Sequence, residues 1–372
     1  MRAYLLKRLL LMIPTLVGIT LVTYGIVRLA PGDPIEAMIR SQTGDINPKV
    51  MKENADRMRQ RLGLIEYHYL RDAVDRAWGP PPHEGAGTRT LRGAAVAVDK
   101  LYGIFLGYGR WMGHLARGDF GESIKYRTSA GSRNPLDLII ERIPVTATLN
   151  AISEVLIFFI AIPVGLAAAR YRGKWLDWGS SFALLGLWSI PVILAGTVLL
   201  GFLGKGGLGW DLFPVAGMHT PGYEKYGLGS YLSDLLWHSA LPVVCLTYGG
   251  LAYLAKLGRA SLLENLRADY VRTARAKGLP ERRVVYHHAL RNSLLPMITT
   301  MVLTLPGLIG GSVIVETIFS IPGMGLLYIG AARAYDISVL MAETLIYGFL
   351  TLFFLIIGDI LYAWADPRIR YE

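Results

Sequence analysis

The sequence has little charge for its length. Only 18% of its 372 residues are Asp, Glu, Lys or Arg, while 52% are hydrophobic. Soluble domains carry about 25% charged residues, so the composition argues against a soluble globular enzyme. Leu, Ile, Val and Phe are too abundant for a disordered chain. There is a single cysteine, Cys245, so no internal disulfide can form and cysteine usage does not indicate a redox compartment.

Motifs for catalysis and cofactor binding are missing as well. The stretch GFLGKGGLG at 201–209 resembles a phosphate-binding loop, but Gly206 stands where a magnesium-binding Ser or Thr would be. A flexible turn at a helix end is the better interpretation. His287 and His288 are adjacent, so on a helix they point about 100° apart and are poorly placed to share a metal. We therefore expect no catalytic residue, no cofactor and no metal site in this chain.

Long apolar runs are what the sequence does have. A hydrocarbon core about 30 Å thick needs roughly 20 residues of helix, and six runs are close to that length or longer: 9–30, 145–169, 179–203, 239–255, 293–315 and 337–357. They predict an all-α polytopic membrane protein with six transmembrane helices. The first run is longer than the apolar region of a typical signal peptide, and Arg28 and Leu29 before Ala30 are not the small residues that a peptidase prefers. We therefore interpret it as a retained anchor rather than a cleaved signal peptide.

Prolines lie inside four of these runs, where they are expected to kink the helix: Pro163, Pro191, Pro242 and Pro306. Pro306 and Gly307, followed by Gly310 and Gly311, mark a bend or a point of close helix packing in the fifth run. Both interpretations stay open at this stage.

The distribution of Lys and Arg predicts the orientation. With the N-terminus in the cytoplasm, the short inside segments 1–8, 170–178, 256–292 and 364–372 hold 17 basic residues, and the short outside loops hold three. Short cytoplasmic loops carry such an excess, so we expect both termini inside. The net charge of +10 then reflects topology, and nucleic-acid binding is not supported.

The long segment 31–143 is expected outside. It has helical patches but no apolar run of spanning length. Residues 51–64 are amphipathic, and the triple proline at 80–82 makes 78–91 look like an irregular linker. The aromatic and glycine-rich stretch 102–115 suits a helix that lies at the membrane interface.

The most basic short loop is 256–292. Leu263, Leu266, Tyr270 and Ala274 fall on one face of a predicted helix. Gly278 follows as a helix-ending residue, and Pro280 prevents the helix from continuing. Residues 281–292 then begin a second helix that leads into the fifth run. The pattern predicts a helix–turn–helix elbow whose tip of small residues, Ala274, Ala276 and Gly278, could dock into a partner. A merely solvated basic loop is the alternative.

The stretch DYVRTARAKGLPERRVVYHHALRNSLLP, 269–296, resembles the EAA loop of ABC-importer permeases in its oligopeptide and dipeptide form. The length of the chain is closer to that of the longer microcin branch of this family. Other stretches are similar to signatures of the same family: APGDP at 30–34, RGDFG at 117–121, ETIFSIPGMG at 316–325 and DPR at 366–368. The resemblance covers almost the whole chain, and residues 75–100 look like an insertion.

This resemblance implies a type I ABC-importer permease fold in a prokaryotic inner membrane. The implied parts are an anchor at 1–31, an extracytoplasmic segment at 32–143, a five-helix core at 144–365 with its coupling loop at 259–292, and a tail at 366–372. The implied partners are a second homologous permease, two ATPase subunits that bind ATP and magnesium, and an extracytoplasmic binding protein. The implied ATPase-coupling residues are Arg272, Thr273, Ala274, Lys277, Gly278, Leu279 and Glu281.

Acidic residues in or beside the spans are candidates for the substrate path. Ionisable groups in lipid cost about 2.5–3.5 kcal/mol and usually face a cavity or a partner. Glu154 and Glu343 could contact the amine of a peptide, with Glu316 at the outer mouth. The alternative for each is a hydrogen bond to a neighbouring helix.

Peptides are the expected substrate class. Nickel, glutathione, microcin and short saccharides stay open, because specificity rests mostly with the binding protein in this family. A secondary transporter would show inverted repeats, which the sequence lacks. A structural membrane subunit of an unrelated complex would leave the elbow unexplained.

Overall fold

In the computed structural model, residues 2–29, 70, 72–73, 76, 86–123 and 125–365 are described. This part of the chain is almost entirely helical, with one isolated β-bridge between Gly204 and Phe213. The expected amphipathic patch at 51–64 lies outside the described residues. The chain forms two compact units, one comprising Met1–Leu9, Ile140–Ile329 and Phe349–Glu372, and the other Leu10–Ile139 and Gly330–Gly348. We call them the core unit and the second unit.

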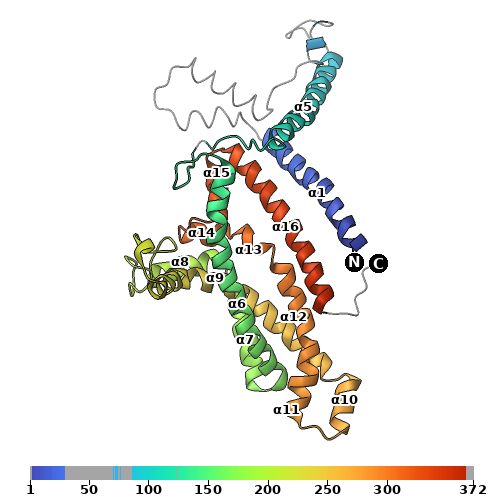
Figure 1. Cartoon of the computed structure of the whole chain (residues 1–372), viewed down its shortest axis with the longest axis vertical. Helices are drawn as coiled ribbons and strands as arrows, with labels where there is room; N and C mark the ends of the chain where they lie inside the picture. Colours follow the sequence, from blue (N-terminus) through green and yellow to red (C-terminus); the bar gives the residue numbers. More distant parts are fainter. Residues whose placement is uncertain are drawn as a thin grey trace. The chain divides into compact units, whose positions relative to one another are not determined.

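Four helices are each long and apolar enough to cross a membrane: α1 (Arg2–Leu29), α6 (Pro135–Arg170), α9 (Leu228–Asn265) and α16 (Ile337–Ala365) (Figure 1). Two bent pairs bring the number of spans to six if each pair is one span. The prediction of an all-α membrane protein is confirmed.

The third predicted run is one of the bent pairs. It forms α7 (Trp175–Trp188) and α8 (Val192–Leu203), whose axes differ by 91° at a break that contains Pro191. The break is expected here because proline lacks the N–H that the helix would need, but its size exceeds an ordinary kink. Pro163 and Pro242, by contrast, lie within the continuous helices α6 and α9.

The fifth predicted run is the other bent pair. Here α11 (Glu281–Arg283), the π-helical turn η2 (Val284–Ala289) and α12 (Leu290–Thr304) lead to a 40° bend at Leu305 and Pro306. The chain continues as α13 (Gly307–Gly310) and α14 (Val313–Ile318). The sequence predicted the position of this bend but not the π-helical turn.

Close packing inside the core unit is set by α6 and α9. A Cβ on Gly165 would lie 2.6 Å from the carbonyl oxygen of Ala255, so only glycine allows the two backbones to approach this closely. At the end of the same helices, Arg259 donates two hydrogen bonds to the Asp177 carboxylate, at 2.6 and 2.9 Å. This bidentate pair ties the start of α7 to α9.

The second unit contains α5 (Ala86–Leu115), α15 in part (Met324–Arg333) and the start of α16. Tyr108 and Trp111 of α5 are buried against Tyr24 of α1 and Met341 of α16. Residues 86–91, expected to be irregular, instead form the first turns of α5, and the predicted helix at 102–115 is its second half. The prolines at 80–82 precede the helix and therefore do not interrupt it.

Candidate functional site

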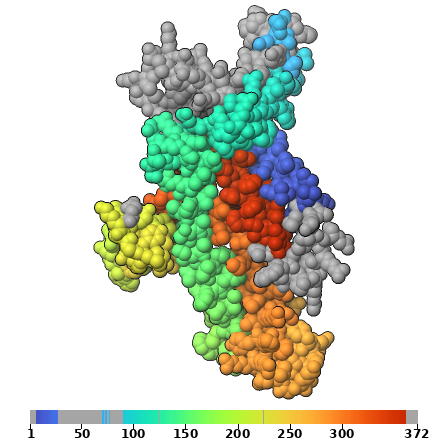
Figure 2. Space-filling model, in the orientation of Figure 1, coloured from blue at the N-terminus to red at the C-terminus, as the bar shows by residue number. Residues whose placement is uncertain are grey.

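The elbow follows α9 after a short break. Helix α10 (Asp269–Ala276) forms the middle of the basic loop. After it, the chain turns at Gly278 and enters α11 (Figure 1). In the space-filling view this part of the core unit, in orange, is exposed on the face shown (Figure 2). The predicted helix–turn–helix form is confirmed.

The turn at Gly278 is a Schellman motif. The N–H of Leu279 bonds to the carbonyl of Ala274 at 3.4 Å, and the N–H of Gly278 bonds to that of Arg275 at 2.9 Å. Gly278 has φ +77°, in the left-handed region that glycine adopts without steric cost. A Cβ at this position would meet no atom within 4 Å. The requirement for glycine is therefore conformational.

An ion pair closes the turn from outside. Arg275 donates to Glu281 through Nη2 at 2.7 Å and Nε at 3.1 Å. The bond raises the pKa of Arg275 above its ordinary value, so the guanidinium stays charged. Both side chains are largely exposed, and such pairs contribute about 0–1 kcal/mol. The pair therefore helps to fix the geometry of the turn but contributes little to its stability.

The predicted coupling residues divide between the outer and inner sides of the elbow. Arg272, Thr273, Lys277, Gly278 and Glu281 are exposed. Ala274 is 6% exposed and belongs to a buried apolar cluster. Leu279 is partly buried against that cluster. That cluster also contains five fully covered side chains: Ala169, Leu262, Val271, Val284 and Ala289.

The expected position of Ala274 at the docking tip is therefore wrong. The expected apolar stripe is confirmed for Leu263, Leu266 and Ala274, which lie in or against this cluster, and is wrong for Tyr270. α9 ends at Asn265 and three residues separate it from α10, which changes the helical phase. Tyr270 consequently lies 40% exposed, and Val271, which the stripe omitted, is fully buried. Ala274 anchors the elbow from inside and leaves Ala276 and Gly278 as its small exposed residues.

A second arrangement of polar groups lies along α6. Four side chains at intervals of four residues share one face of this helix, and we call them the polar row: Arg142, Thr146, Asn150 and Glu154. The sequence analysis singled out only Glu154. The spacing of polar residues in an otherwise apolar span was the signal that could have indicated the other three.

The polar row binds successive parts of the broken fifth span. Asn150 Nδ2 donates to the carbonyls of Gly307 and Leu308, at 3.2 and 3.0 Å. Thr304 Oγ1 donates to Glu154 Oε1 at 2.7 Å. Thr304 lies before the 40° bend, and Gly307 and Leu308 lie after it. Unsatisfied backbone groups in lipid cost several kcal/mol, and Asn150 supplies donors for two backbone carbonyls beyond the bend.

Further along α6, the row supports the loop that follows α14. Arg142 Nη1 donates to the carbonyl of Pro322 at 3.1 Å. Thr146 Oγ1 donates to Glu316 Oε1 at 3.0 Å and accepts from the N–H of Met324 at 2.8 Å. Thr146 is fully buried, so both hydrogen bonds of its hydroxyl are shielded from solvent.

Glu316 is an internal support of this loop. Its residue is 1% exposed, and its carboxylate also accepts from the N–H groups of Ser312, at 3.3 Å, and Leu326, at 2.9 Å. A Cβ on Gly323 would lie 2.6 Å from Glu316 Oε2. The stretch ETIFSIPGMG thus contains the buried acid, a turn and Gly323, which makes room for the acid, while Gly325 allows close approach to the backbone of Val313. An outer-mouth position for Glu316 does not fit this burial.

Glu154 and Glu343 differ in their surroundings. Glu154 is half-buried, and its bond to Thr304 matches the alternative of a contact with a neighbouring helix. Glu343 lies on α16 in the second unit and is 4% exposed.

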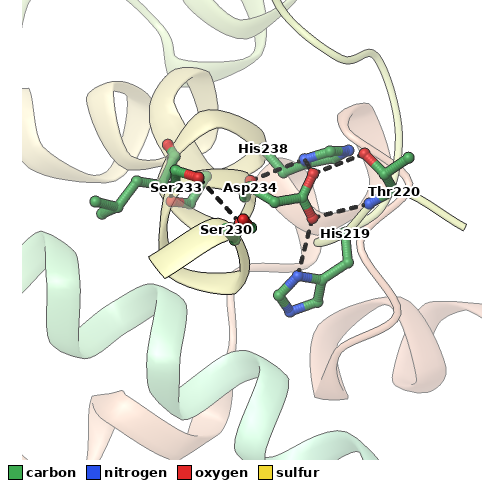
Figure 3. Close-up of polar contacts among 8 residues, drawn as sticks. His219, Thr220, Ser230, Ser233, Asp234 and His238 are labelled. Carbon is green, nitrogen blue, oxygen red and sulfur yellow. Dashed lines mark hydrogen bonds and ion pairs between the residues drawn. The ribbon is translucent and has the colours of Figure 1, made fainter. Parts of the chain in front are cut away.

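The loop after α8 is held to the start of α9 by a polar cluster (Figure 3). Asp234 accepts from Thr220 Oγ1 at 2.6 Å and from the Thr220 N–H at 3.0 Å. His219 and His238 lie on either side of the same carboxylate, at 3.2 and 3.3 Å. Ser233 donates to the carbonyl of Ser230 rather than to a histidine. The cluster is a loop clamp and not a nucleophilic triad.

Residues 161–371 match the family described as "Binding-protein-dependent transport system inner membrane component". The chain belongs to this family. This membership agrees with the apolar spans and assigns the chain to a multi-pass inner membrane component.

Relatives are similar over the full length. The chain is 35% identical to the oligopeptide transport system permease protein AppB of Bacillus subtilis, covering 100% of both chains. It is 33% identical to the di/tripeptide transport system permease protein DppB of Pseudomonas aeruginosa and to the inner membrane ABC transporter permease protein YejB of Escherichia coli O157:H7, again covering 100% of both chains. A structure of the MetNI methionine ABC transporter aligns with 62% of this chain and 97% of that chain, with 19% identity and a TM-score of 0.47.

Glu316 supplies a test of the loop support in this inner membrane component. Replacing Glu316 with Ala removes the acceptor of three donors, and each buried donor left unpaired costs about 1–3 kcal/mol. We expect Glu316→Ala to lower the thermal unfolding temperature of the purified chain markedly, and Glu316→Gln to lower it less. Glu264→Ala, at an exposed acid of α9, is the control. An unchanged unfolding temperature in Glu316→Ala would refute the support role.

Proposed function

We propose that this chain is one permease subunit of an ATP-driven importer of dipeptides and oligopeptides. The observation that carries the proposal is full-length identity of 33–35% to relatives named as oligopeptide and di/tripeptide permeases. The exposed elbow supports the same function, because a permease without its own nucleotide site needs a surface that receives work from elsewhere. The chain itself is proposed to be non-enzymatic.

The proposed assembly has four further subunits. A second homologous permease completes the translocation path, two ATPase subunits bind ATP and magnesium, and an extracytoplasmic binding protein delivers the peptide. The exposed side of the elbow is the proposed ATPase contact, with Arg272, Thr273, Lys277 and Gly278 facing the partner. Ala274 and Leu279 act from inside by fixing α10 against α6 and α9.

Both termini and the elbow are proposed to lie in the cytoplasm, as the positive-inside count indicates. In a Cys245→Ser background, cysteines at Ala130 and Thr273, both exposed positions, should differ in intact cells. An impermeant maleimide should label Ala130→Cys and leave Thr273→Cys unmodified until the membrane is opened. The reverse pattern would contradict the orientation.

Glu154 is the acid we propose for the substrate path. It is half-buried, whereas Glu316 is enclosed by its own loop and Glu343 is almost fully covered. An acid held at the bend of the broken span could contact the amine of a peptide as the path opens. Glu343 stays a weaker candidate of the same kind.

The turn of the elbow gives the sharpest test of coupling. Gly278→Val places a β-branched residue at φ +77°, which costs roughly 1–2 kcal/mol or more. Since 1.4 kcal/mol corresponds to a factor of ten, we expect peptide uptake and ATPase co-purification to fall together by about tenfold. Membrane insertion should continue, because burial of the spans in lipid does not depend on this turn.

Gly131→Val is the matched control. Gly131 has φ +86°, and a Cβ there also meets no atom within 4 Å, but it lies in the loop before α6 and is not part of the elbow. Its substitution introduces the same kind of strain without touching the proposed contact. Normal uptake in Gly278→Val would show that the elbow is only a solvated loop.

The substrate class is tested with the assembled transporter in proteoliposomes. ATP-dependent uptake of a labelled tripeptide should be competed by other short peptides and not by nickel, glutathione or a short saccharide. Uptake of nickel, glutathione or a short saccharide without uptake of peptides would show that the importer is of the same type but has a different substrate class. Uptake by this chain without ATPase subunits would instead indicate a secondary transporter.

A further inference from the structure

A cavity of about 380 Å³ lies beside the elbow, where the ends of α6 and α9 meet α10, α11 and η2. Four charged side chains line it: Arg170, Arg275, Glu281 and Arg282. The remaining lining is apolar and includes Leu262 and Val285. The cavity is built from the core unit alone.

The charges in this cavity do not balance. Arg275 and Glu281 neutralise each other through their two hydrogen bonds. Arg170 and Arg282 remain, and neither makes an ion pair with a carboxylate in the part of the chain that the structure describes. Arg170 lies over the ring of Tyr171, 5.8 Å from its centroid. Three guanidinium groups and one carboxylate therefore line the cavity, which leaves its lining with a net positive charge.

The walls beneath these arginines are apolar and already buried. Leu262 is 1% exposed, Ala169 is 3% exposed and Val285 is 7% exposed. A ligand in the cavity would thus meet guanidinium groups at one side and aliphatic surface at the other. This suits an anion attached to an apolar body better than a small, fully hydrated ion.

The cavity lies at the level where α6 leaves the membrane. Arg170 is the last residue of α6, and the turn that follows leads to Trp175 and Trp178, which are 81% and 61% exposed. Exposed tryptophans are typical of the membrane–water boundary. On the cytoplasmic side, an assignment that rests on the proposed function, this boundary contains anionic headgroups.

We propose that the cavity binds the phosphate group of an anionic phospholipid. Guanidinium forks match the geometry of phosphate oxygens, and basic pockets between membrane helices on the cytoplasmic side bind anionic headgroups. Arg170 and Arg282 contact the phosphate, and the apolar wall covers the glycerol and the first acyl carbons. Because the lining joins α6, α9 and the elbow, the bound lipid stabilises the elbow against the membrane surface. Inorganic phosphate shares the anionic group but has no apolar part.

The test is native mass spectrometry of the purified full chain in detergent, titrated with phosphatidylglycerol. We expect one tight phosphatidylglycerol adduct, which phosphatidylcholine does not replace. Arg170→Gln and Arg282→Gln should each weaken this adduct about fivefold, since one basic residue near headgroups is worth about 1 kcal/mol. A tenfold excess of inorganic phosphate should leave the adduct in place.

Neighbouring arginines provide matched controls. Arg172→Gln and Arg283→Gln remove the same charge within two residues, at exposed positions that do not line this cavity, and should leave the adduct unchanged. Equal weakening in all four variants would reduce the site to general surface charge and overturn the proposal. Wild-type binding in Arg170→Gln and Arg282→Gln, or displacement by phosphate, would also overturn it. Peptide uptake by the wild-type transporter is measured separately, so absence of a phosphatidylglycerol adduct together with normal uptake refutes this inference and leaves the proposed function in place.

Discussion

A helix that breaks inside a membrane must find new partners for its backbone, and this requirement organises the core unit. The fifth span bends by 40° at Leu305 and Pro306, which interrupts its hydrogen bonds at a depth where lipid offers none. The polar row of α6 supplies side-chain hydrogen-bond partners on both sides of the break. Asn150 binds the carbonyls beyond the bend, Glu154 binds Thr304 before it, and Thr146 with Glu316 organises the loop that follows. The break is therefore a supported feature and not a defect.

The same helix also reaches the elbow. Ala169, at the end of α6, belongs to the buried cluster that holds Val271 and Ala274 of α10. α6 thus contacts the broken span along its length and the proposed coupling helix at its end. Movement of the elbow would be transmitted through α11, η2 and α12 to the bend. At the bend, the hydrogen bonds of the polar row would resist that movement. We regard this connection as the physical basis of coupling in the proposed importer.

Several of these features could be predicted from the sequence because their cause is local. The apolar runs, the break at Pro306 and the left-handed turn at Gly278 each depend on residue types at adjacent positions. Features that depend on distant parts of the chain were missed or mistaken. Tyr270 was assigned to the apolar face in place of Val271 because the break between α9 and α10 changes the helical phase. Ala274 was assigned to the tip on its small size alone, which does not reveal the cluster that covers it. Glu316 was assigned to an outer mouth because nothing in its own segment reveals that Thr146, 170 residues earlier, lies beside it. The π-helical turn in η2 likewise has no marker in VVYHHA.

Hydrogen–deuterium exchange at the bend tests the role of the polar row most directly. The amides of Leu308 and Ile309 bond within the turn at the bend, so their exchange reports its opening. The account predicts that Asn150→Ala speeds exchange across 305–312 by about tenfold, while exchange in α9 stays as in the wild type. Unchanged exchange at 305–312 in Asn150→Ala would contradict the claim that the polar row holds the broken span.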